Sequence, residues 1–78
     1  MVTHEVWLEG AAAPLLLDLA DDELFQQFKR WVQKDNAFTA LGWVGTVEDK
    51  NWVINFERVA CITALSKNER RTMGFSTS

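Results

Sequence analysis

The sequence holds one cysteine, one proline and one histidine, and it has no long apolar run. Because Cys61 is alone, no internal disulfide can form, and this favours a reducing cytoplasm. No run approaches the roughly 18 apolar residues that a membrane-spanning helix needs, and the first residues lack the basic and apolar stretches of a signal peptide. We therefore expect a cytoplasmic protein that is neither secreted nor anchored in a membrane.

Side chains for catalysis or metal binding are equally scarce. His4 has no second histidine to join it, so we interpret it as a structural or solvent-edge residue. Cys61 lies in the middle of an apolar run, which predicts a buried and unreactive thiol. The sequence has no glycine-rich phosphate loop and no G-x-S-x-G motif, and the acidic residues between positions 18 and 23 lack the spacing of a calcium loop. These absences predict a protein that is not an enzyme and that takes no cofactor or metal.

The composition is that of one small folded domain. Of the 78 residues, 47% are hydrophobic and 24% are charged, a balance that excludes a disordered chain. Residues 1–39 carry 3 basic and 7 acidic side chains and residues 40–78 carry 5 and 4, so the two halves have net charges of −4 and +1 and sum to −3. An acidic chain of this kind lacks the strongly basic surface of a typical nucleic-acid-binding protein.

One amphipathic helix is predicted from Asp21 to about Lys34. Acidic residues precede its apolar positions and basic residues follow them, as the helix dipole favours. The apolar side chains recur at helical spacing and form a single stripe, which comprises Leu24, Phe25, Phe28, Trp31 and Val32.

The other segments read as strands, because β-branched and aromatic residues alternate with polar ones in them. We predict strands at residues 2–8, 15–19, 38–47, 52–56 and 59–65. A helix starting at Ala11 is the competing interpretation of the second strand. The order strand–strand–helix–strand–strand–strand predicts an α+β domain over residues 1–65, in which one helix packs on one face of an antiparallel sheet of about five strands. Residues 66–78 are polar and predict a mobile C-terminal tail.

Both faces of the last three predicted strands carry apolar side chains, although one helix can cover only one face. A curled sheet, a bound ligand or a second subunit could cover the other face. For so short a chain we favour a homo-oligomer, with a dimer first, and a protein partner as the function. The residues that we predict on this interaction surface are Trp7, Trp43, Trp52 and Val53.

The alternative function is binding of single-stranded nucleic acid. In that case Trp43 and Trp52 would stack on bases, and the tail residues Lys67, Arg70 and Arg71 would contact phosphates. The net negative charge weighs against this alternative.

Overall fold

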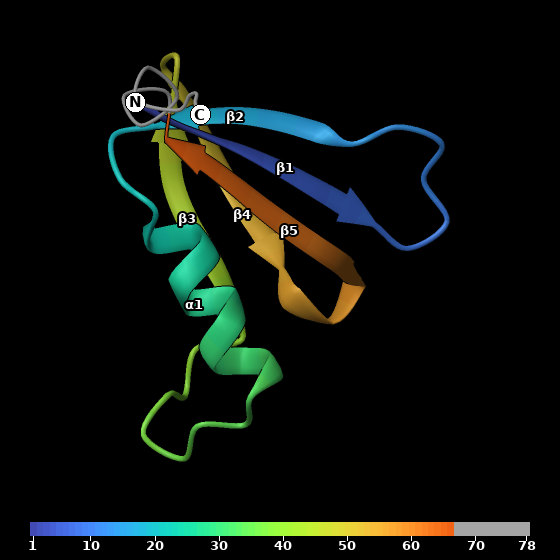
Figure 1. The fold of residues 1–78 in the computed structure, drawn as a ribbon, viewed down its shortest axis with the longest axis vertical. Helices are drawn as coiled ribbons and strands as arrows, with labels where there is room; N and C mark the ends of the chain where they lie inside the picture. Colours follow the sequence, from blue (N-terminus) through green and yellow to red (C-terminus); the bar gives the residue numbers. More distant parts are fainter. Residues whose placement is uncertain (67–78) are drawn as a thin grey trace, which may run out of the picture.

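The computed structural model describes residues 1–66 and shows an α+β domain, as the sequence predicts (Figure 1). Residues 15–19 form a strand that pairs with the first strand, so the hairpin is confirmed and the competing helix is not formed. The elements in chain order are β1 (Val2–Leu8), β2 (Leu15–Leu19), α1 (Glu23–Val32), β3 (Gly42–Val47), β4 (Lys50–Asn55), the 3-10 turn η1 (Phe56–Arg58) and β5 (Val59–Ser66).

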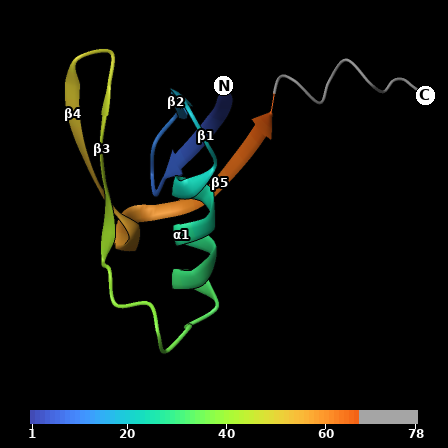
Figure 2. The ribbon, with the colours of Figure 1, turned by 90° about the vertical axis from the view of Figure 1, so that its left-hand side faces the viewer.

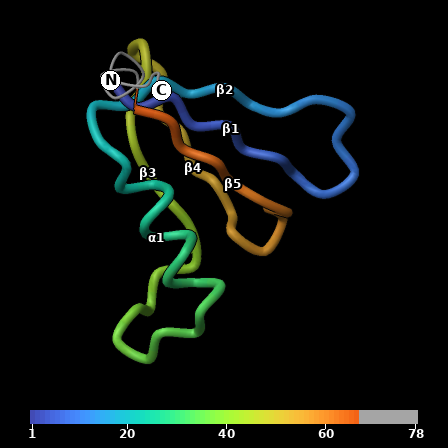
Figure 3. The backbone as a smooth tube through the Cα atoms, in the orientation of Figure 1, coloured from blue at the N-terminus to red at the C-terminus, as the bar shows by residue number. Residues whose placement is uncertain are grey.

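The strands divide into two antiparallel sheets instead of forming one. One sheet has the order β2-β1-β5, and the other is the β3–β4 hairpin, which stands apart from it in Figure 2. The division begins at η1, where the Asn55 side chain accepts a hydrogen bond from the Glu57 amide at 3.0 Å and the Phe56 amide donates to the Leu41 carbonyl at 3.2 Å. This turn directs the chain away from β4, so that β5 pairs with β1 (Figure 3).

The hydrophobic core lies between the two sheets and α1, with Phe56 near its centre. The Phe56 ring contacts the rings of Phe28, Trp31 and Phe38, with centroids 5.5, 6.0 and 6.4 Å away. Each element therefore contributes inward side chains to one cluster, whose buried members are Val6, Leu17, Leu19, Leu24, Trp43, Ile54, Phe56, Val59 and Ile62.

Helix α1 is shorter than predicted by about two residues at each end. The Asp22 side chain does not cap the helix; instead the Asp21 carboxylate accepts from the Glu23 amide at 3.0 Å. The helix lies beside β5, at the edge of the three-stranded sheet opposite β2 (Figures 1 and 2). Its apolar stripe therefore covers the space between the two sheets from one side. The sequence had instead suggested a helix packed across the face of a single sheet.

Several other strand boundaries differ from the prediction, and β4 covers Lys50–Asn55 where residues 52–56 were predicted. The third strand begins at Gly42, because a turn precedes it in which the Asp35 carboxylate accepts from the Ala37 amide at 2.9 Å. The last strand includes Ser66, one residue beyond the predicted end of the domain.

Candidate interaction surface

Trp43 belongs to the core, so its placement on the interaction surface was wrong for this fold. Its side chain is only 8% exposed, and its ring covers Gly45, where an added Cβ would lie 2.3 Å from the ring carbons. A glycine two residues along the same strand thus provides the space for the indole to fold inward. The sequence carried this signal in the Gly42-Trp43-Val44-Gly45 stretch.

The other two predicted tryptophans are half-buried. Trp52 packs against the core, and its indole nitrogen is buried without a hydrogen-bond partner in the described structure. Trp7 lies on the outer face of the three-stranded sheet, where its indole nitrogen donates to the Glu5 carboxylate at 2.9 Å. The two tryptophans that the nucleic-acid alternative would stack on bases thus lie in the core, for Trp43, and half-buried against it, for Trp52.

Val53 does lie on the surface, in an apolar patch that we call the hairpin face and define as Leu41, Val44 and Val53. These side chains are 71%, 74% and 78% exposed. Val44 and Val53 are direct partners across the β3–β4 ladder, and all three residues line one hollow of about 470 Å³. The apolar character of these strands is evident in the sequence, but the sequence does not identify this trio because it does not give the cross-strand register.

The hairpin face also has free strand edges on both sides. The β3–β4 sheet has two strands, so within residues 1–66 neither strand is hydrogen-bonded to a third. Exposed edges next to exposed aliphatic side chains are the usual starting point for strand pairing between molecules.

His4 is fully buried, on the inner face of β1. Its Nδ1 lies 3.2 Å from the Val2 carbonyl oxygen, and its Nε2 has no partner among the described residues. Burial lowers the pKa of His4 below its ordinary value of 6.5; the Val2 carbonyl and the carboxylates of Asp22 and Asp21 oppose this shift without cancelling it. A neutral, enclosed imidazole fits a structural role, and residues 1–66 contain no group of three side chains that could hold a metal ion.

Cys61 is exposed, which corrects the prediction of a buried thiol. The β1–β5 register shifts between the Trp7–Cys61 pair and the Leu8–Val59 pair, which leaves Ala60 as an extra residue in β5. Cys61 therefore lies opposite Trp7 on the outer face of the sheet. Simple alternation along the strand predicted the opposite face, since an irregular register cannot be seen in the sequence.

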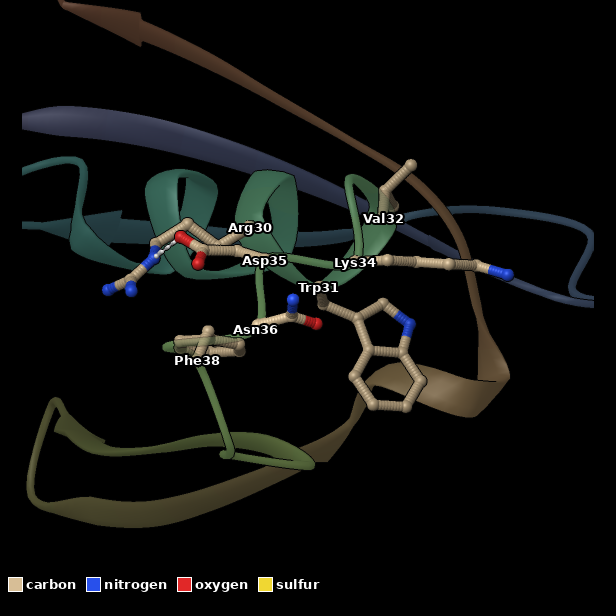
Figure 4. A pocket seen from close by; sticks show the side chains of 7 residues that line it. All are labelled: Arg30, Trp31, Val32, Lys34, Asp35, Asn36 and Phe38. Carbon is tan, nitrogen blue, oxygen red and sulfur yellow. Dashed lines mark hydrogen bonds and ion pairs between the residues drawn. The ribbon is translucent and has the colours of Figure 1, made fainter.

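A larger hollow of about 550 Å³ lies at the end of α1 (Figure 4). Its charged groups are largely paired: Arg30 forms an ion pair with Asp35 at 2.8 Å and lies 5.0 Å from the centre of the Phe38 ring. The Ala37 amide, and next the Arg30 side chain, hold the pKa of Asp35 below its ordinary range. These contacts give Arg30 and Asp35 a structural role in holding the turn that follows the helix, and Lys34 is the third charged residue that lines the hollow.

The predicted tail contacts Lys67, Arg70 and Arg71 lie outside the described residues. No helix within residues 1–66 has the length and apolar character needed to cross a bilayer. The chain matches no family model, and searches of curated proteins and of solved structures give no match.

Proposed function

We propose that this chain is a small, non-enzymatic interaction module that forms a homodimer through its hairpin face and binds another protein elsewhere on its surface. The observation that carries the proposal is the gathering of Leu41, just before β3, with Val44 and Val53 of the two-stranded sheet, each more than two-thirds exposed. The exposed thiol of Cys61 supports a location in the reducing cytoplasm.

The size of the hairpin face indicates a weak dimer. A two-fold axis would place each hairpin face against its copy, so that six aliphatic side chains become buried. At about 1.5–3 kcal/mol each, their burial contributes about 9–18 kcal/mol. Association costs about 4–15 kcal/mol in lost freedom of motion, so the two terms nearly balance. The midpoints of the two ranges differ by about 4 kcal/mol, so we expect a dissociation constant of about 1 mM, lower where strand edges also pair, and the test has to reach millimolar concentrations.

Sedimentation equilibrium over a hundredfold range of concentration tests the dimer. Val53→Glu should shift the protein to monomer, because it would bring two carboxylates together at a dry interface. The matched control is Leu16→Glu, which makes the same charge change at an exposed leucine on β2, in the other sheet. Circular dichroism confirms that both variants remain folded. A wild-type protein that is monomeric throughout, or equal effects of the two substitutions, would refute the proposal.

A further inference from the structure

The two strand edges of the β3–β4 hairpin differ in what surrounds them. β3 lies close to α1 and β2, whereas no element of residues 1–66 other than β3 lies against β4 to a similar extent (Figure 1). In Figure 2, β4 is also the strand farthest from the three-stranded sheet. An added strand can therefore reach the outer edge of β4, which we call the β4 edge.

The turn of the hairpin determines which backbone groups of β4 point outward. Glu48 and Asp49 form a two-residue loop with positive φ angles of 52° and 67°, as in a type I′ turn. In such a hairpin the residues on either side of the loop form a hydrogen-bonded pair, and bonded pairs then alternate along the ladder with pairs that are not bonded. The Phe56 amide donates to the Leu41 carbonyl in the same alternation, which shows that the pattern continues past the last pair of the ladder.

Three residues of β4 therefore have backbone groups that β3 does not use. The residues of β4 that bond to β3 alternate with these three, which are Asn51, Val53 and Asn55. Each of them directs its N–H and C=O to the β4 edge, and each is exposed. By the same alternation, Val44 and Thr46 direct their groups to the outer edge of β3.

The β4 edge is complementary to itself. Its sequence from 51 to 55 is Asn-Trp-Val-Ile-Asn, so the polar and apolar positions are symmetric about Val53. A second copy that pairs antiparallel across a two-fold axis at Val53 places each Asn51 opposite the Asn55 of the other copy, and each Trp52 opposite an Ile54. Amide then faces amide and an aromatic ring faces a β-branched side chain, which are favourable cross-strand pairs, and no like charges meet.

We propose that the β4 edge pairs with the β4 edge of a second copy of this chain, antiparallel and with the two-fold axis at Val53. The two hairpins then form one continuous four-stranded sheet in the order β3-β4-β4-β3, and the hairpin faces of both copies lie on the same side of it. This pairing does not rest on the hairpin-face dimer proposed above. Where both interfaces form, two such sheets stack through their hairpin faces, and the assembly is a tetramer.

Amide hydrogen exchange, measured by NMR over a hundredfold range of concentration that reaches millimolar, reports on the β4 edge directly. The amides of Asn51, Val53 and Asn55 should exchange at least about tenfold more slowly at the highest concentration than at the lowest, because they become hydrogen-bonded between copies. The amides of Val44 and Thr46 are the internal control and should change little. Exchange at Val53 that does not depend on concentration, or protection that develops at Val44 and Thr46 instead, would overturn the inference.

Two proline substitutions form a matched pair, because Thr46 and Asn51 are cross-strand partners whose side chains share one hydrogen bond of 3.0 Å. Each substitution removes that bond and one outward N–H, and neither removes an N–H that the β3–β4 ladder uses. Asn51→Pro should abolish the concentration-dependent protection of the Val53 amide, whereas Thr46→Pro should preserve it. Circular dichroism confirms that both variants remain folded, and equal protection of Val53 in the two variants would contradict the proposal.

The β4 edge and the hairpin face can fail separately. Val44→Glu places a charge on the hairpin face but outside β4, so it should dissociate the hairpin-face dimer and leave the protection of the Val53 amide dependent on concentration. Asn51→Pro should have the reverse effect, since Asn51 is not part of the hairpin face. A dimer without protection at Val53 refutes only the edge pairing. An unchanged sedimentation profile for Val44→Glu, with protection retained, refutes only the hairpin-face dimer.

Discussion

Replacing Phe56 by alanine should remove about half of the stability of the domain. Burial of the ring contributes about 1.5–3 kcal/mol, and each of its three ring contacts adds about 0.5–1.5 kcal/mol. The sum is at least about 3 kcal/mol, which agrees with the roughly 3–5 kcal/mol typical of Phe→Ala in a core. A domain of this length has a free energy of unfolding of about 4–12 kcal/mol, so Phe56→Ala should leave it marginally stable.

Urea unfolding followed by tryptophan fluorescence measures this loss, since Trp31 lies against Phe56 and reports on the cluster directly. We expect the midpoint to fall by about 2–3 M. Phe25→Ala is the comparison variant, because Phe25 is a half-buried phenylalanine on α1 that makes no ring contact with Phe56 among the described residues. If both substitutions lowered the free energy of unfolding equally, Phe56 would not be the centre of the core.

Three further predictions concern single contacts and can be checked in the same assay. Gly45→Ala should cost about 1–3 kcal/mol, because the new methyl group would collide with the Trp43 ring, and near-ultraviolet circular dichroism should report the displaced indole. Asn55→Ala should cost about 0.5–2 kcal/mol through loss of the side-chain bond to the Glu57 amide; an unchanged urea midpoint would show that the turn does not need this bond. His4 has a lowered pKa in the fold, so stability should be constant above about pH 6.5 and should fall as the pH drops below it, because the unfolded chain then binds a proton that the folded chain resists. His4→Gln should flatten this slope between pH 7 and pH 5, and an equal slope in both proteins would contradict the assignment.

The local elements of this fold could be predicted because their signals are local. The apolar stripe of α1 and the alternation in β1 each depend on neighbouring residues, and both segments form as expected. The order of elements and the α+β class follow from these signals.

The division into two sheets could not be predicted, because it depends on a three-residue turn. In the sequence, Phe56 reads as the end of a strand, and residues 57–58 read as a short interruption between two strands that would pair as a hairpin. In the structure, the Phe56 side chain is drawn into the aromatic cluster and the turn sends β5 to the far side of the core. The preference of Phe56 for the cluster is a tertiary effect that no short window of sequence contains.

The sequence indicated that part of the surface would be apolar, but it did not identify the residues that form this patch. The excess of apolar side chains correctly indicated an exposed patch, and Val53 belongs to it. Trp43 and Cys61 were assigned to the wrong side of their strands, the first because Gly45 makes room for its ring and the second because the register of β5 is irregular.

The pairing of β1 with β5 also determines when this protein can fold. The second residue of the chain has its strand partner at Ser66, so the central strand of the larger sheet waits for the last strand to be synthesised. During that interval one edge of β1 lacks its neighbour, and the core side chains of β1 and β2 lack the cover that β5 brings. Closing so long a loop is slow, and strand edges exposed in the meantime favour contacts between nascent chains. The β3–β4 hairpin keeps strand edges of this kind in the described part of the folded chain.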